Sequence, residues 1–170
     1  MLFRSKPQVI LLIKNTPDRV EQLLLPCPIY IKDEPPRKLP YDVEEAVIKI
    51  NDAIKTGDSA RHLEGLGILQ RMVDKDPHAA YNPQLLLYIA SYYEYLSKHD
   101  QAIKIFSKVV DRYPESQYAS LAQCATGIIC EDKLNDRGRG EDAYRVVLER
   151  YPDSLEALWI EKKLGIKKGR

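Results

Sequence analysis

Histidines and cysteines are the residues of this chain best suited to metal binding or nucleophilic chemistry. His62, His78 and His99 lie far apart along the sequence. None of them has a Cys, Asp or Glu at the spacing that metal sites use. Glu44 and Glu45 are adjacent in a predicted helix, so their carboxylates point in different directions. We therefore expect no catalytic residue, no cofactor site and no metal site.

The cysteine pattern does not predict a disulfide framework. Cys124 and Cys130 are six positions apart in one predicted helix, which places them too far apart along the helix axis to bridge. Cys27 lies alone in a proline-rich segment, and no CxxC pair occurs. We expect free thiols in a reducing compartment, with Cys124 buried on a packing face.

Charge is balanced over the whole chain. Among 170 residues there are 26 Lys and Arg and 25 Asp and Glu, for a net charge of +1. This balance argues against a general nucleic-acid binder. The string NDRGRGE at residues 135–141 is predicted to be an exposed turn rather than a nucleic-acid motif. The bulk composition therefore favours a non-enzymatic helical protein without a nucleic-acid partner.

Residues 82–116 show the clearest local pattern, that of two helices joined by a turn. Asn82 followed by Pro83 resembles a helix start with a cap and a first-position proline. Pro114 ends the second helix after an apolar face at helical spacing. The apolar positions of the two helices are Leu86, Ile89, Ala90 and Tyr93, then Ala102, Ile103, Phe106, Val109 and Val110.

The same spacing recurs upstream of two other prolines. Counting back from Pro114, Val109 is five positions before, Phe106 eight and Ala102 twelve. The same offsets give Met72, Leu69 and Gly65 before Pro77, and Val147, Tyr144 and Gly140 before Pro152. Short strings repeat as well, since DRYPES ends one unit and ERYPDS the next. A recurring two-helix unit predicts a helical repeat protein.

This pattern resembles the tetratricopeptide repeat (TPR) family. The resemblance implies an all-α solenoid of about three helix pairs over residues 41–170, with seven helices between Tyr41 and Leu164. The repeats would end near Pro77, Pro114 and Pro152, and a helix at residues 154–164 would cap the array. The third repeat would place Leu121, Cys124, Ala125 and Ile128 where the second has Leu86, Ile89, Ala90 and Tyr93.

The first helix of each pair lines a binding groove in this family. By that resemblance, the groove residues here are Leu87, Tyr88, Ser91, Tyr92, Glu94, Tyr95, Ala122 and Thr126. Two interpretations of the tyrosines stay open: most of the rings pack between helices, or Tyr88, Tyr92 and Tyr95 form an aromatic wall for a peptide. The basic clamp with which some TPR proteins hold acidic chaperone tails is missing from these positions.

Residues 1–40 differ in composition from the rest and hold seven of the eleven prolines. We interpret them as a proline-rich N-terminal docking arm whose apolar positions include Val9, Leu11, Ile13, Ile29, Tyr30 and Ile31. The arm would pack on its own repeats, dock on a partner or a second copy, or remain disordered. The apolar run Val9–Ile13 is followed by Lys14, so we expect neither a signal peptide nor a membrane span.

Taken as a TPR-like protein, the chain is expected to be an adaptor or scaffold subunit that binds an unidentified protein partner. The alternative is a chaperone for a secreted or membrane protein. The repeat strings in residues 82–164 also resemble those of bacterial envelope TPR proteins, including lipoproteins of outer-membrane assembly. Because no signal peptide is expected, we expect a cytoplasmic location; the resemblance makes the bacterial periplasm or a membrane-associated complex the alternative. Peripheral membrane contact and homo-oligomer formation stay open.

Overall fold

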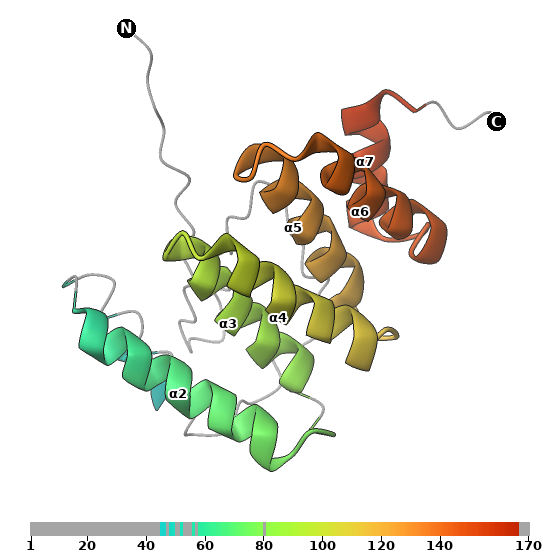
Figure 1. Ribbon diagram of the computed structural model, residues 1–170. Helices are drawn as coiled ribbons and strands as arrows, with labels where there is room; N and C mark the ends of the chain where they lie inside the picture. Colours follow the sequence, from blue (N-terminus) through green and yellow to red (C-terminus); the bar gives the residue numbers. More distant parts are fainter. Residues whose placement is uncertain are drawn as a thin grey trace, which may run out of the picture.

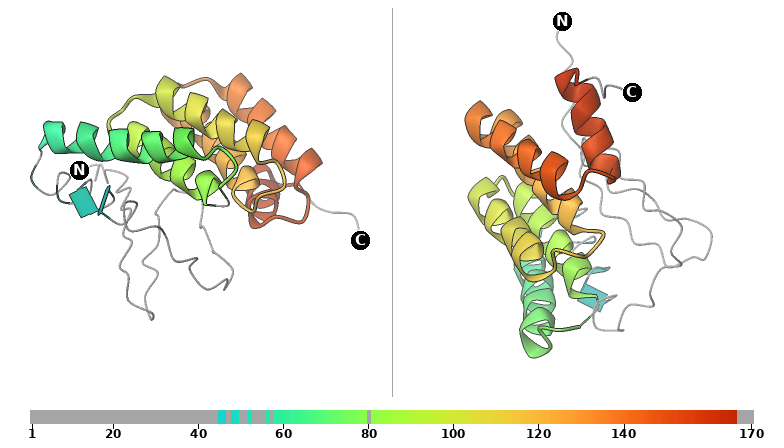
Figure 2. Two further views of the ribbon diagram at one scale, coloured as in Figure 1. Left: turned by 90° about the horizontal axis from the view of Figure 1, so that it is seen from below. Right: turned by 90° about the vertical axis from the view of Figure 1, so that its right-hand side faces the viewer.

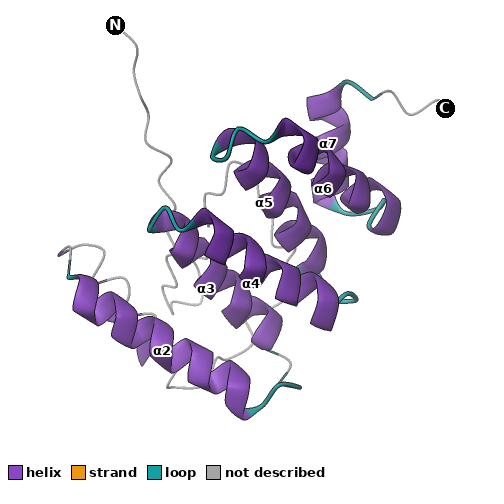
Figure 3. Ribbon diagram, viewed as in Figure 1, coloured by secondary structure: helices purple, strands orange, loops and turns teal. Residues whose placement is uncertain are grey.

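The computed structural model describes residues 58–79 and 81–166, together with six helical positions between 45 and 56. The predicted N-terminal arm, residues 1–40, lies outside the described residues. Six helices follow one another in the described part, and it contains no strand (Figures 1 and 3). They are α2 (Ser59–Lys75), α3 (Asn82–Tyr95), α4 (His99–Arg112), α5 (Ala119–Asp132), α6 (Arg137–Arg150) and α7 (Leu155–Leu164).

The helices form two layers. Figure 2 shows α2, α4 and α6 side by side in one layer, which we call the outer layer, and α3, α5 and α7 in the other, which we call the inner layer. Contacts run in chain order from α2 to α3, α4, α5, α6 and α7. This zigzag is the arrangement of a helical repeat, so the all-helical repeat architecture predicted from the sequence is confirmed.

The core of the outer layer contains the residues that the repeat spacing selects. Ala102, Phe106 and Val109 of α4 are completely buried. The corresponding residues Gly140, Tyr144 and Val147 of α6 are buried as well, and so are Gly65 and Leu69 of α2, with Met72 partly buried. These helices are amphipathic, because their other faces carry charged residues that remain in water.

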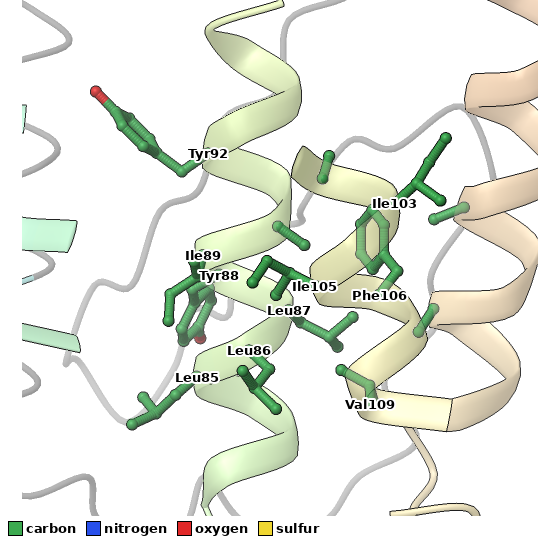
Figure 4. Packing of buried hydrophobic residues seen from close by; sticks show 14 of the residues in the cluster. Leu85, Leu86, Leu87, Tyr88, Ile89, Tyr92, Ile103, Ile105, Phe106 and Val109 are labelled. Carbon is green, nitrogen blue, oxygen red and sulfur yellow. The ribbon is translucent and has the colours of Figure 1, made fainter. Parts of the chain in front are cut away.

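The inner helices α3 and α5 are buried around most of their circumference. In α3, 11 of 14 residues are buried and in α5, 10 of 14, whereas in α4 only six are. Figure 4 shows Phe106 and Val109 of α4 on the side toward which Leu87 points, while Tyr92 projects from the other side of α3. A helix that is apolar on all sides needs neighbours on all sides. The inner layer is therefore the part of the fold that depends most on packing.

Two glycines bring α5 and α6 into close contact. A methyl group on Gly127 would lie 2.4 Å from the Tyr144 ring, and one on Gly140 would lie 3.2 Å from the Gly127 carbonyl oxygen. Both positions recur in the preceding pair, because Gly127 is the ninth residue of α5 as Ala90 is of α3, and Gly140 is the fourth of α6 as Ala102 is of α4. The equivalence of Ala90 and Ala125 expected from the sequence is therefore wrong by two positions. It assumes an offset of 35 residues between the two helices, whereas α5 begins 37 residues after α3.

The sequence predicts a turn over the whole string NDRGRGE, and this prediction is wrong for most of it. Helix α6 begins at Arg137, and Asp136 caps it by accepting a hydrogen bond from the backbone N–H of Arg139 at 3.1 Å. The glycines had indicated a turn because they disfavour a helix interior. Here Gly140 is required by the contact with α5.

A tyrosine joins consecutive repeats. The Tyr113 hydroxyl, just after α4, donates to the Pro77 carbonyl at 2.6 Å and accepts from Asn82 Nδ2 at 3.2 Å. Asn82 also donates to the Asp76 carbonyl at 2.6 Å. Asn82 therefore holds the repeat junction, and its side chain does not cap α3 as predicted. The corresponding Tyr151 of the next repeat has a buried hydroxyl without a hydrogen-bond partner, and Ala119 stands in the place of Asn82.

Replacing Gly127 tests the close α5–α6 contact. We expect Gly127→Ala to lower the free energy of unfolding by about 1–3 kcal/mol, because the methyl group collides with a buried ring. The control is Gly138→Ala in the exposed first turn of α6, where the nearest atom to a new methyl is 3.8 Å away. It should be neutral or stabilising by about 0.5 kcal/mol. Equal urea midpoints for the two variants would contradict this contact.

A matched pair of substitutions tests the repeat junction. Tyr113→Phe should cost about 1 kcal/mol, because the Pro77 carbonyl and the Asn82 amide both lose a partner. Tyr151→Phe removes a hydroxyl that has no partner, so its effect should stay within about 0.5 kcal/mol. Thermal melting of both variants distinguishes the two cases, and a larger loss for Tyr151→Phe would refute the assignment.

Candidate functional site

The structure places six of the eight predicted groove residues on α3, and it exposes them unequally. Tyr95 in the last turn is 42% exposed. Thr126 is half-buried. The remaining six are buried, with exposed fractions of 0% for Ser91 and Ala122, 4% for Tyr92, 5% for Leu87, and 8% for Tyr88 and Glu94. Tyr95 is therefore the member of this set that a partner reaches first.

The tyrosines of α3 combine packing with hydrogen-bonding capacity. Tyr88 and Tyr92 belong to the main core cluster, and the Tyr88 hydroxyl accepts a hydrogen bond from Gln84 Nε2 at 3.0 Å. Tyr92 and Tyr95 stack with ring centroids 6.0 Å apart. Burial raises the pKa of Tyr88 to about 12 and also raises the pKa of Tyr92. Both hydroxyls are therefore protonated at neutral pH and able to donate.

Toward the C-terminal end of α3, the Ser91 hydroxyl and one carboxylate oxygen, Oε2, of Glu94 are buried without a hydrogen-bond partner, as is Asn82 Oδ1 at its start. Burial raises the pKa of Glu94, whereas the charges of Lys133 and His99 act to lower it. Polar atoms of this kind are uncommon in proteins and often mark a position that a ligand or water completes.

The two predicted groove residues of α5 are engaged in packing and local hydrogen bonding. Ala122 belongs to the core cluster that also contains residues of α3 and α4. The Thr126 hydroxyl donates to the Ala122 carbonyl at 3.0 Å, within its own helix. The α3 residues thus supply the exposed aromatic edge and the unpartnered polar atoms, and Ala122 and Thr126 supply neither.

The cysteines and the possible metal ligands give no sign of a reactive centre in the described residues. Cys124 and Cys130 are buried, as the sequence predicted for Cys124. Burial raises the pKa of Cys130, which favours its unreactive thiol form. Within residues 58–79 and 81–166 and the six earlier positions, no three His, Cys, Asp or Glu side chains are grouped to hold a metal ion. None of the helices described is both long and apolar enough to cross a membrane.

A second cluster, which the sequence did not reveal, attaches α7 to the last helix pair. Lys163 of α7 forms an ion pair with Glu131 of α5 at 2.9 Å, and the Tyr144 hydroxyl donates to the same carboxylate oxygen at 3.0 Å. The Lys163 ammonium also lies 5.5 Å from the Trp159 ring centroid, and Trp159 meets Tyr144 edge to face. This cluster is structural, because all its groups satisfy one another.

The pH dependence of stability tests that cluster. The bond from Lys163 lowers the pKa of Glu131 below its ordinary value, so the pair stabilises the fold above the ordinary carboxyl range. This contribution is lost as the pH falls through the pKa of the folded state. The pair is about one-third exposed, so the effect should be about 0.2–1 kcal/mol.

Lys163→Met should therefore flatten the acid limb of a plot of unfolding free energy against pH. The neighbouring exposed Lys162 provides the control, since Lys162→Met should leave that limb unchanged. If Lys163→Met keeps the wild-type slope, the ion pair does not contribute to stability.

Comparison with known proteins adds one match. Residues 84–116 match the model of a tetratricopeptide repeat. These residues span α3, α4 and the following turn, the segment that carries the aromatic edge and the repeat junction. A search of curated proteins returned no match.

Tetratricopeptide repeats are in general protein-interaction modules and are typically not enzymes. The matched segment has the helix pair, the small residue at the crossing and the closing proline that the sequence predicted. The match over residues 84–116, together with the helix pair found there, shows that this chain contains a tetratricopeptide repeat.

Proposed function

We propose that the protein is a non-enzymatic adaptor or scaffold subunit. In this proposal the inner layer, and α3 above all, binds a peptide or helix of a partner protein. Residues 1–40, with Val9, Leu11, Ile13, Ile29, Tyr30 and Ile31, supply a second contact.

The observation that carries this proposal is the difference in charge between the inner helices α3 and α5 and the outer helix α4. The only charged residue of α3 is Glu94, whereas α4 has five: Asp100, Lys104, Lys108, Asp111 and Arg112. Helix α5 is also free of charge until its last turn, at Glu131 and Asp132. An outer helix needs charged residues to face water, whereas an apolar inner helix needs a covering surface.

The exposed end of α3 supports the same conclusion. Tyr95 is 42% exposed and stacks on Tyr92, which gives a rigid aromatic platform at the edge of the inner layer. Tyrosine is enriched where proteins bind one another, because its ring offers a large contact area at low entropic cost and its hydroxyl stays polar.

Quantitative affinity capture with the full chain tests the proposal. Tyr95→Glu should reduce recovery of a stoichiometric partner by about tenfold or more, because a charge enters an aromatic contact. Gln101→Glu, which adds the same charge at an exposed position of α4, should retain the partner. Replacing Ile29, Tyr30 and Ile31 with Ser should weaken capture through the second contact.

The pattern of losses separates the alternatives. Loss of the partner with Gln101→Glu but not with Tyr95→Glu would place binding on the outer layer and contradict the proposal. A partner that is captured before export and released afterwards would identify a chaperone instead of an adaptor subunit.

A further inference from the structure

Ser91 and Glu94 stand three positions apart on α3, and each has a polar atom that the described structure leaves unpaired. Ser91 is completely buried, and Glu94 is 8% exposed. The Ser91 Oγ and the Glu94 Oε2 both lack hydrogen-bond partners. Residues three apart in a helix lie on the same face, so the two unpaired groups lie on one face of α3.

The charge of Glu94 is not neutralised by the cations nearest to it. Lys133, just after α5, and His99, the first residue of α4, act on the carboxylate electrostatically. Neither forms an ion pair with Glu94 among the contacts of the described residues. A carboxylate held in an apolar setting favours a ligand that carries a positive charge and hydrogen-bond donors.

An aromatic ring on the Ser91 face favours the same ligand. Tyr95 follows Ser91 by four positions, so its exposed ring lies on the Ser91 face of α3, where it stacks on Tyr92. Aromatic faces attract ammonium and guanidinium groups. A carboxylate three positions after Ser91 and an aromatic ring four positions after it are thus suited to a lysine or an arginine rather than to an acidic or purely apolar side chain.

We infer that the inner face of α3 binds its partner through a basic side chain, a lysine or arginine that pairs with the Glu94 carboxylate and donates to the Ser91 hydroxyl. This inference rests on the proposed function and narrows it to partners that present a basic residue among apolar ones. Charge complementarity selects the partner, and the exposed Tyr95 ring contacts the stem of the basic side chain.

Selection of peptides by the full chain tests the inference. The probe is a random peptide library displayed on phage and selected on the wild-type protein. Selected peptides should be enriched in Lys or Arg over the unselected library. Their affinity should fall about tenfold or more for Glu94→Gln, because one partner of a desolvated charge pair is removed.

Glu94→Gln is nearly isosteric and removes a buried charge, so the variant should fold, and thermal melting verifies this. The control Glu115→Gln removes an exposed carboxylate after α4 and should bind the same peptides as the wild type. Ser91→Ala should give a smaller loss in the same direction.

Three results would overturn the inference. Peptides without Lys or Arg enrichment, or with equal affinity for Glu94→Gln, would refute the basic ligand and leave the proposed function standing. A synthetic peptide of residues 1–40 that displaces the selected peptides would assign the face to the chain's own N-terminal segment. Failure to select any peptide would count against the proposed function itself.

Discussion

The close approach of α5 and α6 at Gly127 and Gly140 is the constraint on which the rest of the structure depends. The Gly127 carbonyl oxygen of α5 lies against Gly140 of α6, which has no side chain. The Tyr144 ring occupies the space over Gly127. Tyr144 can then reach Glu131 with its hydroxyl and Trp159 with its ring edge. The two glycines thus set the distance between α5 and α6 and the position at which α7 packs on them.

The two layers have different physical roles as a consequence. Outer helices α4 and α6 bury one face and keep their charged side chains in water. They therefore need no further partner beyond the neighbouring helices of the array. The inner helices α3 and α5 are almost free of charge and are buried on several faces, which leaves few positions for polar groups. Ser91 and Glu94 are exceptions in α3. Because packing leaves one polar atom of each without a partner, these atoms are available to select a ligand.

The outer-layer core was predictable from sequence, because spacing relative to a closing proline depends only on local helix geometry. Ala102, Phe106 and Val109 and their equivalents in α6 followed from that rule. Positions that depend on contacts between helices did not follow. Helix α5 begins 37 residues after α3, which puts the crossing at Gly127 and not at Ala125. Asn82 serves a neighbouring repeat instead of its own helix end. The cluster around Lys163 joins three helices and has no local signal in the sequence.

The candidate site was predictable only in part, for the same reason. Helical spacing indicated which α3 residues share a face, but burial and pairing depend on tertiary neighbours. Hydrogen–deuterium exchange of the full chain, alone and with its captured partner, tests the central claim most directly. The account predicts added protection in α3, residues 82–95, with α4, residues 99–112, unchanged. Protection gained along α4 and α6 without any change in α3 would contradict it.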